Sequence, residues 1–458
     1  MPASTRSKRV TAPSPDANSG KTKKVQTRSS KVRYNGWEVP SHNYELDVID
    51  TASVTPERFY AEYVATRRPV VLRGFIADPS FSAPAKWTNE YLKATAGDAP
   101  LMVEERSSPS DSFGKGNEVP MTFRAFLDLL EQRDMLHYLT TQDVEADPET
   151  GRPGLMAPFI AQLAHDFPLT PSLLGHLVPQ NINVWMGNAV DGSTTGLHHD
   201  YHDNLYILLR GKKHFRLYAP SDVEAMYTRG SLLQVHENGR INYEGEPTTA
   251  YGADPLSEQA AIVAKTQRDA EAELEAAEAD LENGVDGAAE RVEAAEAKLE
   301  AAMEAAMDVE WDENDKDGDD EDEDEETGED EETGEDAEDV FEDDLVARRV
   351  VDKTVQFPIN FSRVKTSRPA AELAAEFPLF ASAKATTCEL GVGDMLYLPA
   401  SWFHEVTSFT VDGASDKGHL ALNYWYHPPD VTTAFSSPYS SSFWPDDFAA
   451  RGLAKADD

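Results

Sequence analysis

The sequence predicts a mainly β fold, a sandwich or barrel of short antiparallel strands that is preceded by mixed helices and strands. Three observations lead to this prediction. Short apolar runs recur from Asn181 onward and are separated by Gly and Pro turns. Helix and strand signals alternate between Trp37 and Leu130. An Ala/Glu-rich segment at 251–345 interrupts the β pattern, so we interpret it as an insertion in the β domain.

Charge is distributed unevenly along the 458 residues. The chain carries 83 Asp and Glu against 41 Lys and Arg, a formal net charge of −42. Residues 251–345 hold 40 acidic and 5 basic residues, a net charge of −35, whereas residues 1–33 hold nine Lys and Arg and one Asp. Without these two segments, about 330 residues of ordinary composition remain, the size of one elaborated domain.

The segment 1–33 is rich in Ser, Thr, Pro, Lys and Arg and has almost nothing to bury, so we expect a disordered basic arm. It could act as a nuclear address or contact an anionic partner, although we favour a solvated tail. No apolar run is long enough for a membrane span, and the N-terminus lacks the apolar core of a signal peptide. Cys388 is the sole cysteine, which excludes an intrachain disulfide. We expect an intracellular protein, cytoplasmic or nuclear or both, with no membrane or direct nucleic acid partner.

Residues 34–180 read as an N-terminal elaboration of the β domain. A helix should begin at Thr55-Pro56, with Thr55 as the cap and Pro56 in the first helical position. The run 69–74 predicts a short buried strand that ends at a glycine. The apolar spacing of 122–130 predicts an amphipathic helix, and 137–141 predicts a strand.

Five strands are expected in the β domain, which we assign to 181–430. They cover 181–187, 204–209, 213–218, 393–399 and 419–426. Arg210-Gly211-Lys212 joins the second and third of these, and we expect a tight hairpin there. Residues 431–458 are assigned to a C-terminal tail.

The insertion divides into two kinds of sequence. Residues 256–282 and 288–307 have high helix propensity, and the breaker at 283–287 predicts that they fold as a helical hairpin. Residues 312–344 are nearly pure acid with Gly and Thr, a composition that cannot collapse in water. The insertion could contact a basic partner by charge, or it could be a tolerated surface loop that aids solubility.

The chemistry is indicated by Leu197-His198-His199-Asp200. On a strand, His198 and Asp200 would leave the same face and could hold one metal ion. His404 follows an apolar strand and a proline turn, where it could supply a third ligand. Two His and one carboxylate are the ligand set of non-haem Fe(II) oxygenases, and zinc would fit them less distinctively.

Two other histidines compete for this role. His199 should point to the opposite face of the strand, and His202 has the same parity as His198 but lies beyond Asp200. A lone His-x-Asp pattern arises by chance in many chains, so it needs further support. His198 and His404 are 206 residues apart, or 111 without residues 251–345, so the insertion is expected at a surface loop.

Three blocks of sequence resemble the Jumonji-C family of 2-oxoglutarate oxygenases. They are Thr195 to Leu205 with Gly211-Lys212-Lys213-His214-Phe215, Gly393 to His404, and Leu422-Asn423-Tyr424-Trp425-Tyr426. Within the family the chain is most similar to the small cupin-like hydroxylases of the lysyl-3-hydroxylase type that act on developmentally regulated GTP-binding proteins. The resemblance implies a double-stranded β-helix (jelly roll) with flanking N-terminal helices. It covers about 37–250 and 345–430, and neither the arm nor the insertion.

By this resemblance, His198, Asp200 and His404 would hold Fe(II). Lys213 would pair with the distal carboxylate of 2-oxoglutarate, a charge-assisted bond that suits a partly dry pocket, while Lys212 faces the other way on the strand. The remaining cosubstrate contacts that the resemblance implies are Thr195, Tyr138, Asn204 and Asn423. For Tyr138 and Asn423 a purely structural role stays open. We expect Trp185, Trp402 and Trp425 to be core aromatics rather than ligand contacts.

The expected activity is hydroxylation of a protein side chain, lysine first, with Fe(II), 2-oxoglutarate and O₂ as cofactors. The substrate could be a GTP-binding protein or another basic protein. Two alternatives stay open. One is N-methyl-lysine demethylation by the same oxidative chemistry, and the other is a catalytically idle module that binds basic proteins. The chain shows no histone-reading module, which disfavours the first, and the intact ligand set disfavours the second.

Overall fold

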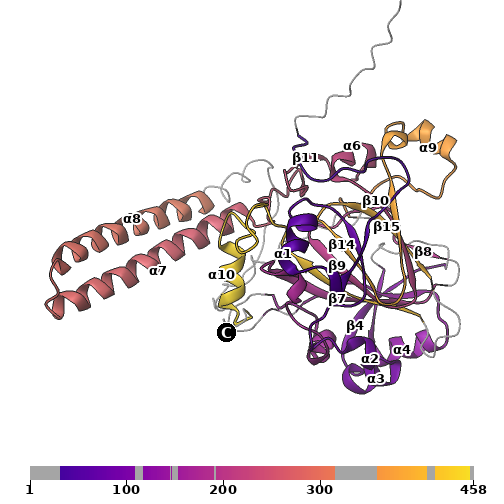
Figure 1. The fold of residues 1–458 in the computed structure, drawn as a ribbon, viewed down its shortest axis with the longest axis horizontal. Coiled ribbons are helices and arrows are strands. Elements are labelled where there is room, and N and C mark those ends of the chain that lie inside the picture. The colour runs from indigo at the N-terminus through magenta and orange to yellow at the C-terminus, as the bar shows by residue number, and fades with distance from the viewer. Residues whose placement is uncertain are drawn as a thin grey trace, which may run out of the picture.

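The computed structural model describes residues 31–108, 117–144, 146, 153–189, 192–314, 358–409 and 418–453, and Figure 1 shows how their elements are arranged. Two large β-sheets form the body. The nine-stranded sheet runs in the order β2 (Val48–Asp50), β3 (Val70–Arg73), β14 (Asp394–Leu398), β9 (Asp203–Arg210), β16 (His419–Tyr426), β7 (Pro179–Gly187), β6 (His137–Leu139), β4 (Pro100–Glu105), β5 (Glu118–Thr122). The five-stranded sheet runs β1 (Tyr44–Glu45), β13 (Thr386–Leu390), β10 (Lys212–Tyr218), β15 (Phe403–Phe409), β8 (Ser193–Thr194). The pair β11 (Leu232–Val235) and β12 (Ile241–Tyr243) completes the sheets.

Helices are short except for two. The α-helices are α1 (Pro56–Phe59), α2 (Ala83–Lys86), α3 (Asn89–Ala96), α4 (Phe123–Glu131), α5 (Pro158–Ala161), α6 (Val223–Met226), α7 (Pro255–Glu282), α8 (Ala288–Asn314), α9 (Ala370–Glu376) and α10 (Phe443–Ala450). Single turns occur at η1 (Thr51–Ser53), η2 (Tyr60–Val64), η3 (Ala164–Asp166), η4 (Ser172–Leu174), η5 (Pro220–Asp222) and η6 (Phe380–Ser382). None of the helices in the described part of the chain is long and apolar enough to cross a membrane.

The mainly β, jelly-roll fold predicted from the sequence is confirmed. The outer face of the nine-stranded sheet packs against the N-terminal helices, with Ile182, Val184 and Ile207 in that core. Its inner face turns toward the five-stranded sheet, and residues such as Tyr206 and Leu208 belong to this second core. Strand β9 is therefore buried on both faces, which explains its continuous apolar run.

Local signals predicted most of the elements correctly. The Thr55 hydroxyl accepts a hydrogen bond from the Arg58 N–H at 3.3 Å and caps α1, which begins at Pro56. Thr122 caps α4 in the same way, through the Ala125 N–H at 3.2 Å. The expected strands at 69–74, 137–141, 181–187, 204–209, 213–218, 393–399 and 419–426 appear as β3, β6, β7, β9, β10, β14 and β16.

The hairpin expected at Arg210-Gly211-Lys212 was wrong. Strand β9 pairs with β14 and β16 in the nine-stranded sheet, whereas β10 pairs with β13 and β15 in the five-stranded sheet. Gly211 is the point where the chain passes between sheets, at φ +84°. A Cβ atom at Gly211 would lie 2.7 Å from the Cβ of His419 and 2.8 Å from the carbonyl oxygen of Phe409, so only glycine fits this corner.

The termini of the β body extend further than the sequence indicated. The basic arm was predicted for 1–33, and residues 1–30 lie outside the described part of the chain. Within the arm, the Lys31 carbonyl accepts from the Val235 N–H at 2.8 Å and the Arg33 N–H donates to the Val235 carbonyl at 3.0 Å. At the other end, the segment assigned to a tail contains α10. The Tyr439 hydroxyl ties this segment to the body by donating to the His427 carbonyl at 2.9 Å.

The insertion forms the helical hairpin α7–α8, which projects away from the β body (Figure 1). Helix α8 continues past the predicted end at 307, and the acidic run from 315 onward lies outside the described residues. The base of the hairpin rests on α10. Lys265 pairs with Asp446 at 3.1 Å, and the Trp444 indole N–H donates to the Tyr251 carbonyl at 2.9 Å. Both sheets keep their ladders, because the hairpin leaves from a loop after β12.

Candidate metal centre and cosubstrate cavity

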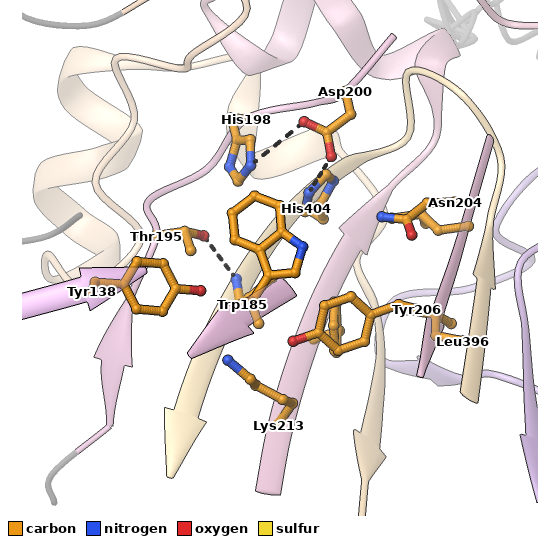
Figure 2. A pocket seen from close by; sticks show the side chains of 13 residues that line it. Tyr138, Trp185, Thr195, His198, Asp200, Asn204, Tyr206, Lys213, Leu396 and His404 are labelled. Carbon is orange, nitrogen blue, oxygen red and sulfur yellow. Dashed lines mark hydrogen bonds and ion pairs between the residues drawn. The ribbon is translucent and has the colours of Figure 1, made fainter. Parts of the chain in front are cut away.

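The structure brings His198, Asp200 and His404 together, and their ligand atoms all lie within 4.8 Å of one another. His198 Nε2 is 4.0 Å from Asp200 Oδ1, and His404 Nε2 is 3.5 Å from Asp200 Oδ2 (Figure 2). His404 is the second residue of β15. His198 and Asp200 do not lie on a regular strand as expected, but in an extended loop between β8 and β9 that touches β15 at His198.

Backbone carbonyls orient both imidazole rings. His198 Nδ1 lies 3.0 Å from the Gly196 carbonyl oxygen, and His404 Nδ1 lies 2.9 Å from the Trp402 carbonyl oxygen. A carbonyl can only accept, so each Nδ1 carries the proton and each Nε2 lone pair faces the cluster. Burial, with a smaller contribution from neighbouring His404, lowers the pKa of His198 to about 4, which favours the neutral ring that a metal requires.

The two competing histidines lie outside the cluster. His199 is fully buried on the other side of the loop, and its Nε2 is 2.8 Å from the Tyr243 hydroxyl. His202 stacks on Trp425 with ring centroids 5.8 Å apart. In the described part of the chain, no other group of three or more metal-ligating side chains comes together.

The turn before His404 is held from several sides. Ser401 adopts a left-handed backbone conformation at φ +60° and is buried. Its N–H donates to the Asp200 carbonyl at 2.7 Å, which joins the two ligand segments directly. In the same turn, the Ala400 N–H donates to the Asp203 carboxylate at 2.9 Å. Arg67 donates twice to this carboxylate, at 2.8 and 2.5 Å. This buried ion pair fixes the start of β9 relative to the turn.

A cavity with about 480 Å³ of empty space, its mouth included, opens beside the triad. Its walls come from both sheets and combine apolar side chains with a few polar groups. The lining residues are Tyr138, Trp185, Thr195, His198, Asp200, Asn204, Tyr206, Lys213, Phe215, Leu396, Leu398, His404 and Val406. Figure 2 shows the Lys213 ammonium and the hydroxyls of Tyr138 and Tyr206 directed toward a common space. The size and lining suit a small polar ligand.

The two neighbouring lysines of β10 differ as strand parity predicts. Lys213 points into the cavity and is 1% exposed, and its ammonium donates to the Ser408 hydroxyl at 2.6 Å. Within the described residues, no carboxylate pairs with it. Burial alone lowers the pKa of Lys213 to about 7. Lys212 instead faces solvent and pairs with Glu389 at 2.8 Å.

The other expected cosubstrate residues lie at different depths. Thr195, Tyr138 and Asn204 line the cavity. Asn423 does not, because it lies one layer behind, where it accepts from the Trp185 indole N–H at 2.6 Å and donates to Asn204 at 3.1 Å. Asn423 can therefore affect the cavity only indirectly, through its hydrogen bonds to Trp185 and Asn204.

Sequence reasoning misjudged or missed three residues here. Trp185 was expected to be a core aromatic, but it is only partly buried and lines the cavity. Trp402, in contrast, is buried and stacks on Trp37 at 5.8 Å. Tyr206 was read only as part of a strand, although it shares the inward face with Asn204 two residues earlier. Ser408, the partner of Lys213, gave no signal in the sequence.

The donor set fits a divalent metal and a dicarboxylate. Two neutral imidazoles and one carboxylate on one side of an open cavity are the ligands of non-haem Fe(II) sites. Lys213 is buried and has no carboxylate partner within the described chain. Its positive charge can therefore pair with a carboxylate of a ligand. The residues present therefore match Fe(II) and 2-oxoglutarate.

Comparison with known proteins identifies the family. The profile of the cupin-like domain matches residues 56–432. The JmjC domain-containing protein 4 of Schizosaccharomyces pombe is 31% identical over 435 residues, which span 89% of each chain. The chain belongs to the cupin-like JmjC family. This family generally uses Fe(II) and 2-oxoglutarate, so the comparison supports 2-oxoglutarate oxygenase activity for the site described above.

Two further relatives carry functional names. The human bifunctional peptidase and (3S)-lysyl hydroxylase JMJD7 is 22% identical over 383 residues, 81% of each chain. The lysine-specific demethylase 8 of Danio rerio is 25% identical over 193 residues, 41% of this chain and 44% of the relative. The hydroxylase thus matches the cupin-like JmjC protein over most of its length, and the demethylase over less than half.

Proposed function

We propose that this cupin-like JmjC protein is an Fe(II)- and 2-oxoglutarate-dependent oxygenase that hydroxylates a lysine side chain of a protein substrate. One observation carries the proposal. The three metal-ligating side chains and the buried, carboxylate-free Lys213 line the same cavity. The likeness to a lysyl hydroxylase over 81% of the chain supports lysine as the target.

The protein's own part begins with the metal ligands. His198, Asp200 and His404 would hold Fe(II), with the Nδ1 protons of both histidines donated to backbone carbonyls. Those two hydrogen bonds fix the tautomer and the ring orientation. When bound, Fe(II) with 2-oxoglutarate and O₂ would supply the oxidising chemistry, in which 2-oxoglutarate is converted to succinate and CO₂ and one oxygen atom enters a C–H bond.

Lys213 would bind the distal carboxylate of 2-oxoglutarate. Its buried ammonium donates to the Ser408 hydroxyl, and an incoming carboxylate would favour the protonated form. Thr195 and Tyr138 line the same cavity and would add hydroxyl donors to the same group. Asn204 also lines the cavity, and it accepts a hydrogen bond from the Asn423 side chain. The apolar walls at Leu396, Leu398 and Val406 exclude water from the reacting groups.

Demethylation of N-methyl-lysine is a second candidate, since a demethylase is among the relatives. The purified protein with Fe(II), 2-oxoglutarate and lysine-containing substrates tests both reactions at once by mass spectrometry. A substrate heavier by one oxygen atom supports hydroxylation, whereas the loss of a methylene equivalent from a methylated lysine supports demethylation. Basic proteins, and GTP-binding proteins first, are the substrates to try. If neither modification and no succinate formed, the chain would be an idle binding module.

A further inference from the structure

The metal loop, residues Leu197–Tyr201, is fixed by its backbone although it has no regular secondary structure. Each of its five consecutive carbonyls accepts a hydrogen bond from another part of the chain. The donors are Ser362 N to Leu197 at 2.8 Å, His404 N to His198 at 2.6 Å, Asn360 Nδ2 to His199 at 2.5 Å, Ser401 N to Asp200 at 2.7 Å and Arg240 Nη1 to Tyr201 at 2.7 Å. The loop therefore takes its shape from its surroundings.

Three of these five donors come from the two segments that flank the insertion. Arg240 immediately precedes β12, and its guanidinium also donates to Thr248 at 2.8 Å on the way to α7. Tyr243 in β12 adds the contact with His199 Nε2. Asn360 and Ser362 follow the insertion, at the start of the described range 358–409. The segments before and after the insertion thus meet on the loop that carries two of the three candidate metal ligands.

Asn360 makes the most specific of these contacts. Its side-chain amide donates to the His199 carbonyl, and its backbone carbonyl accepts from the His199 N–H at 3.3 Å, so it binds both backbone polar groups of one residue. The next residue, Phe361, stacks on the His198 imidazole with centroids 4.7 Å apart and an interplanar angle of 10°. Asn360 therefore holds the backbone of His199, which lies between the two ligands His198 and Asp200. Its neighbour Phe361 packs on the ring of His198.

We propose that Asn360 is a positioning residue of the metal site and that, with Arg240 and Tyr243, it clamps the metal loop between the two segments that flank the insertion. The inference rests on the proposed function in one respect, that the triad binds a divalent metal. Groups that orient metal ligands without touching the metal commonly change metal affinity about ten- to a hundredfold when they are removed. A loop held only by its neighbours should be at the upper end of that range.

The test compares two asparagines in the full chain, with Mn²⁺ as the probe. Asn360→Leu removes the amide that holds His199. Asn188→Leu is the control, since the Asn188 side-chain amide also donates to backbone carbonyls, of Leu130 at 3.0 Å and Asp134 at 2.9 Å, away from the metal loop. The Kd for Mn²⁺, followed by the paramagnetic resonance of the free ion, and the metal-free Tm are measured for each variant.

We expect Asn360→Leu to weaken Mn²⁺ binding about tenfold or more, while Asn188→Leu leaves the Kd unchanged although both lower the Tm. If Asn360→Leu does not fold, Tyr243→Phe serves instead, because it removes only the hydroxyl that meets His199 and should weaken binding in the same direction. Wild-type affinity in a folded Asn360→Leu or Tyr243→Phe variant overturns the clamp alone. A wild-type protein that binds no Mn²⁺ overturns the proposed function and the clamp together.

Discussion

The backbones of His198 and His404 hydrogen-bond to each other in both directions. The His198 N–H donates to the His404 carbonyl at 3.0 Å, and the His404 N–H donates to the His198 carbonyl at 2.6 Å. The two residues are 206 apart in the sequence, yet a reciprocal pair of backbone hydrogen bonds joins them, and the centroids of their rings lie 4.3 Å apart. Neither side chain contributes to this bridge, so the ligands can be replaced without breaking it.

Alanine at His198, Asp200 or His404 should therefore abolish iron-dependent turnover and leave the fold largely intact. The backbone bridge and the carbonyl contacts of the loop survive each substitution, while one of three ligands is lost. Succinate formation and the Tm measure the two effects. His202→Ala is the control, because His202 lies outside the cluster on Trp425. Near wild-type succinate production by His404→Ala would show that the triad is assigned wrongly.

Lys213→Ala should raise the KM for 2-oxoglutarate sharply, whereas Lys212→Ala should change it little. Loss of a charge-assisted bond to a buried carboxylate costs about 1.5–3 kcal/mol, which is roughly ten- to a hundredfold in affinity. Lys212 faces solvent beside Glu389 and serves as the matched control. The comparison needs only initial rates of succinate formation against 2-oxoglutarate concentration. Equal effects at the two positions would contradict the assignment of Lys213 to the cosubstrate.

The affinity for 2-oxoglutarate should fall as the pH rises above about 7. Burial holds the pKa of Lys213 near that value in the free protein, so the ammonium is present below it and is lost as the pH rises through it. Binding a dicarboxylate above this pH must then be accompanied by proton uptake. Measuring Kd for 2-oxoglutarate between about pH 6 and about pH 8 tests this. Lys213→Met should bind weakly with a flatter profile, and an unchanged slope in that variant would rule out Lys213 as the titrating group.

Removing one partner of the buried pair Arg67–Asp203 should destabilise the fold severely. Both side chains are almost completely buried, and Asp203 also accepts from the Tyr397 hydroxyl at 2.6 Å and the Ala400 N–H. Leaving one charge uncompensated costs about 3–5 kcal/mol. Denaturant unfolding of Arg67→Met should show this loss. The exposed pair Arg58–Glu62 is the comparison, and Arg58→Met should cost less than about 1 kcal/mol.

The sequence indicated the three candidate metal ligands, which the structure brings together, because residue type and spacing carry that chemistry. His198 and Asp200 are two apart, and Lys213 lies on the inward parity of β10, features that survive any detail of the fold. The alternation of side chains along a strand tells which face a residue lies on, but not how far it is from a cavity. For this reason Asn423 was expected to contact the cosubstrate, although it lies one layer behind Asn204. For the same reason Trp185 was left in the core.

Other features had no local signal at all. The corner at Gly211 looks like a hairpin in sequence, because turn residues do not reveal which sheet the next strand joins. Asn360 donates to the backbone carbonyl of His199, 161 residues away in the sequence. Every residue has such a carbonyl, so the sequence does not indicate which one will accept a side-chain hydrogen bond. Such contacts follow only from the path of the chain around the insertion.

Replacing residues 256–345 with a Gly/Ser linker should leave a folded, metal-binding protein. Helices α7 and α8 pack mainly on each other, and a loop's length changes its closure entropy only slowly. This deletion retains Tyr251, which is bonded to Trp444 at the base of the hairpin, as well as the clamp residues Arg240 and Asn360. Metal affinity and 2-oxoglutarate turnover without substrate should stay near wild type.

The same deletion should slow reaction with a Lys/Arg-rich protein substrate at low salt. Residues 256–345 hold 39 acidic and 5 basic residues and so carry −34 of the net charge of −42, which should attract a basic partner over a distance. The difference between the two proteins should fade as added salt shortens the screening length to about 8 Å near physiological ionic strength. An uncharged lysine-containing peptide is the control, because it should react equally with both. A deletion variant that cannot bind metal would instead show that the hairpin supports the metal loop through the clamp.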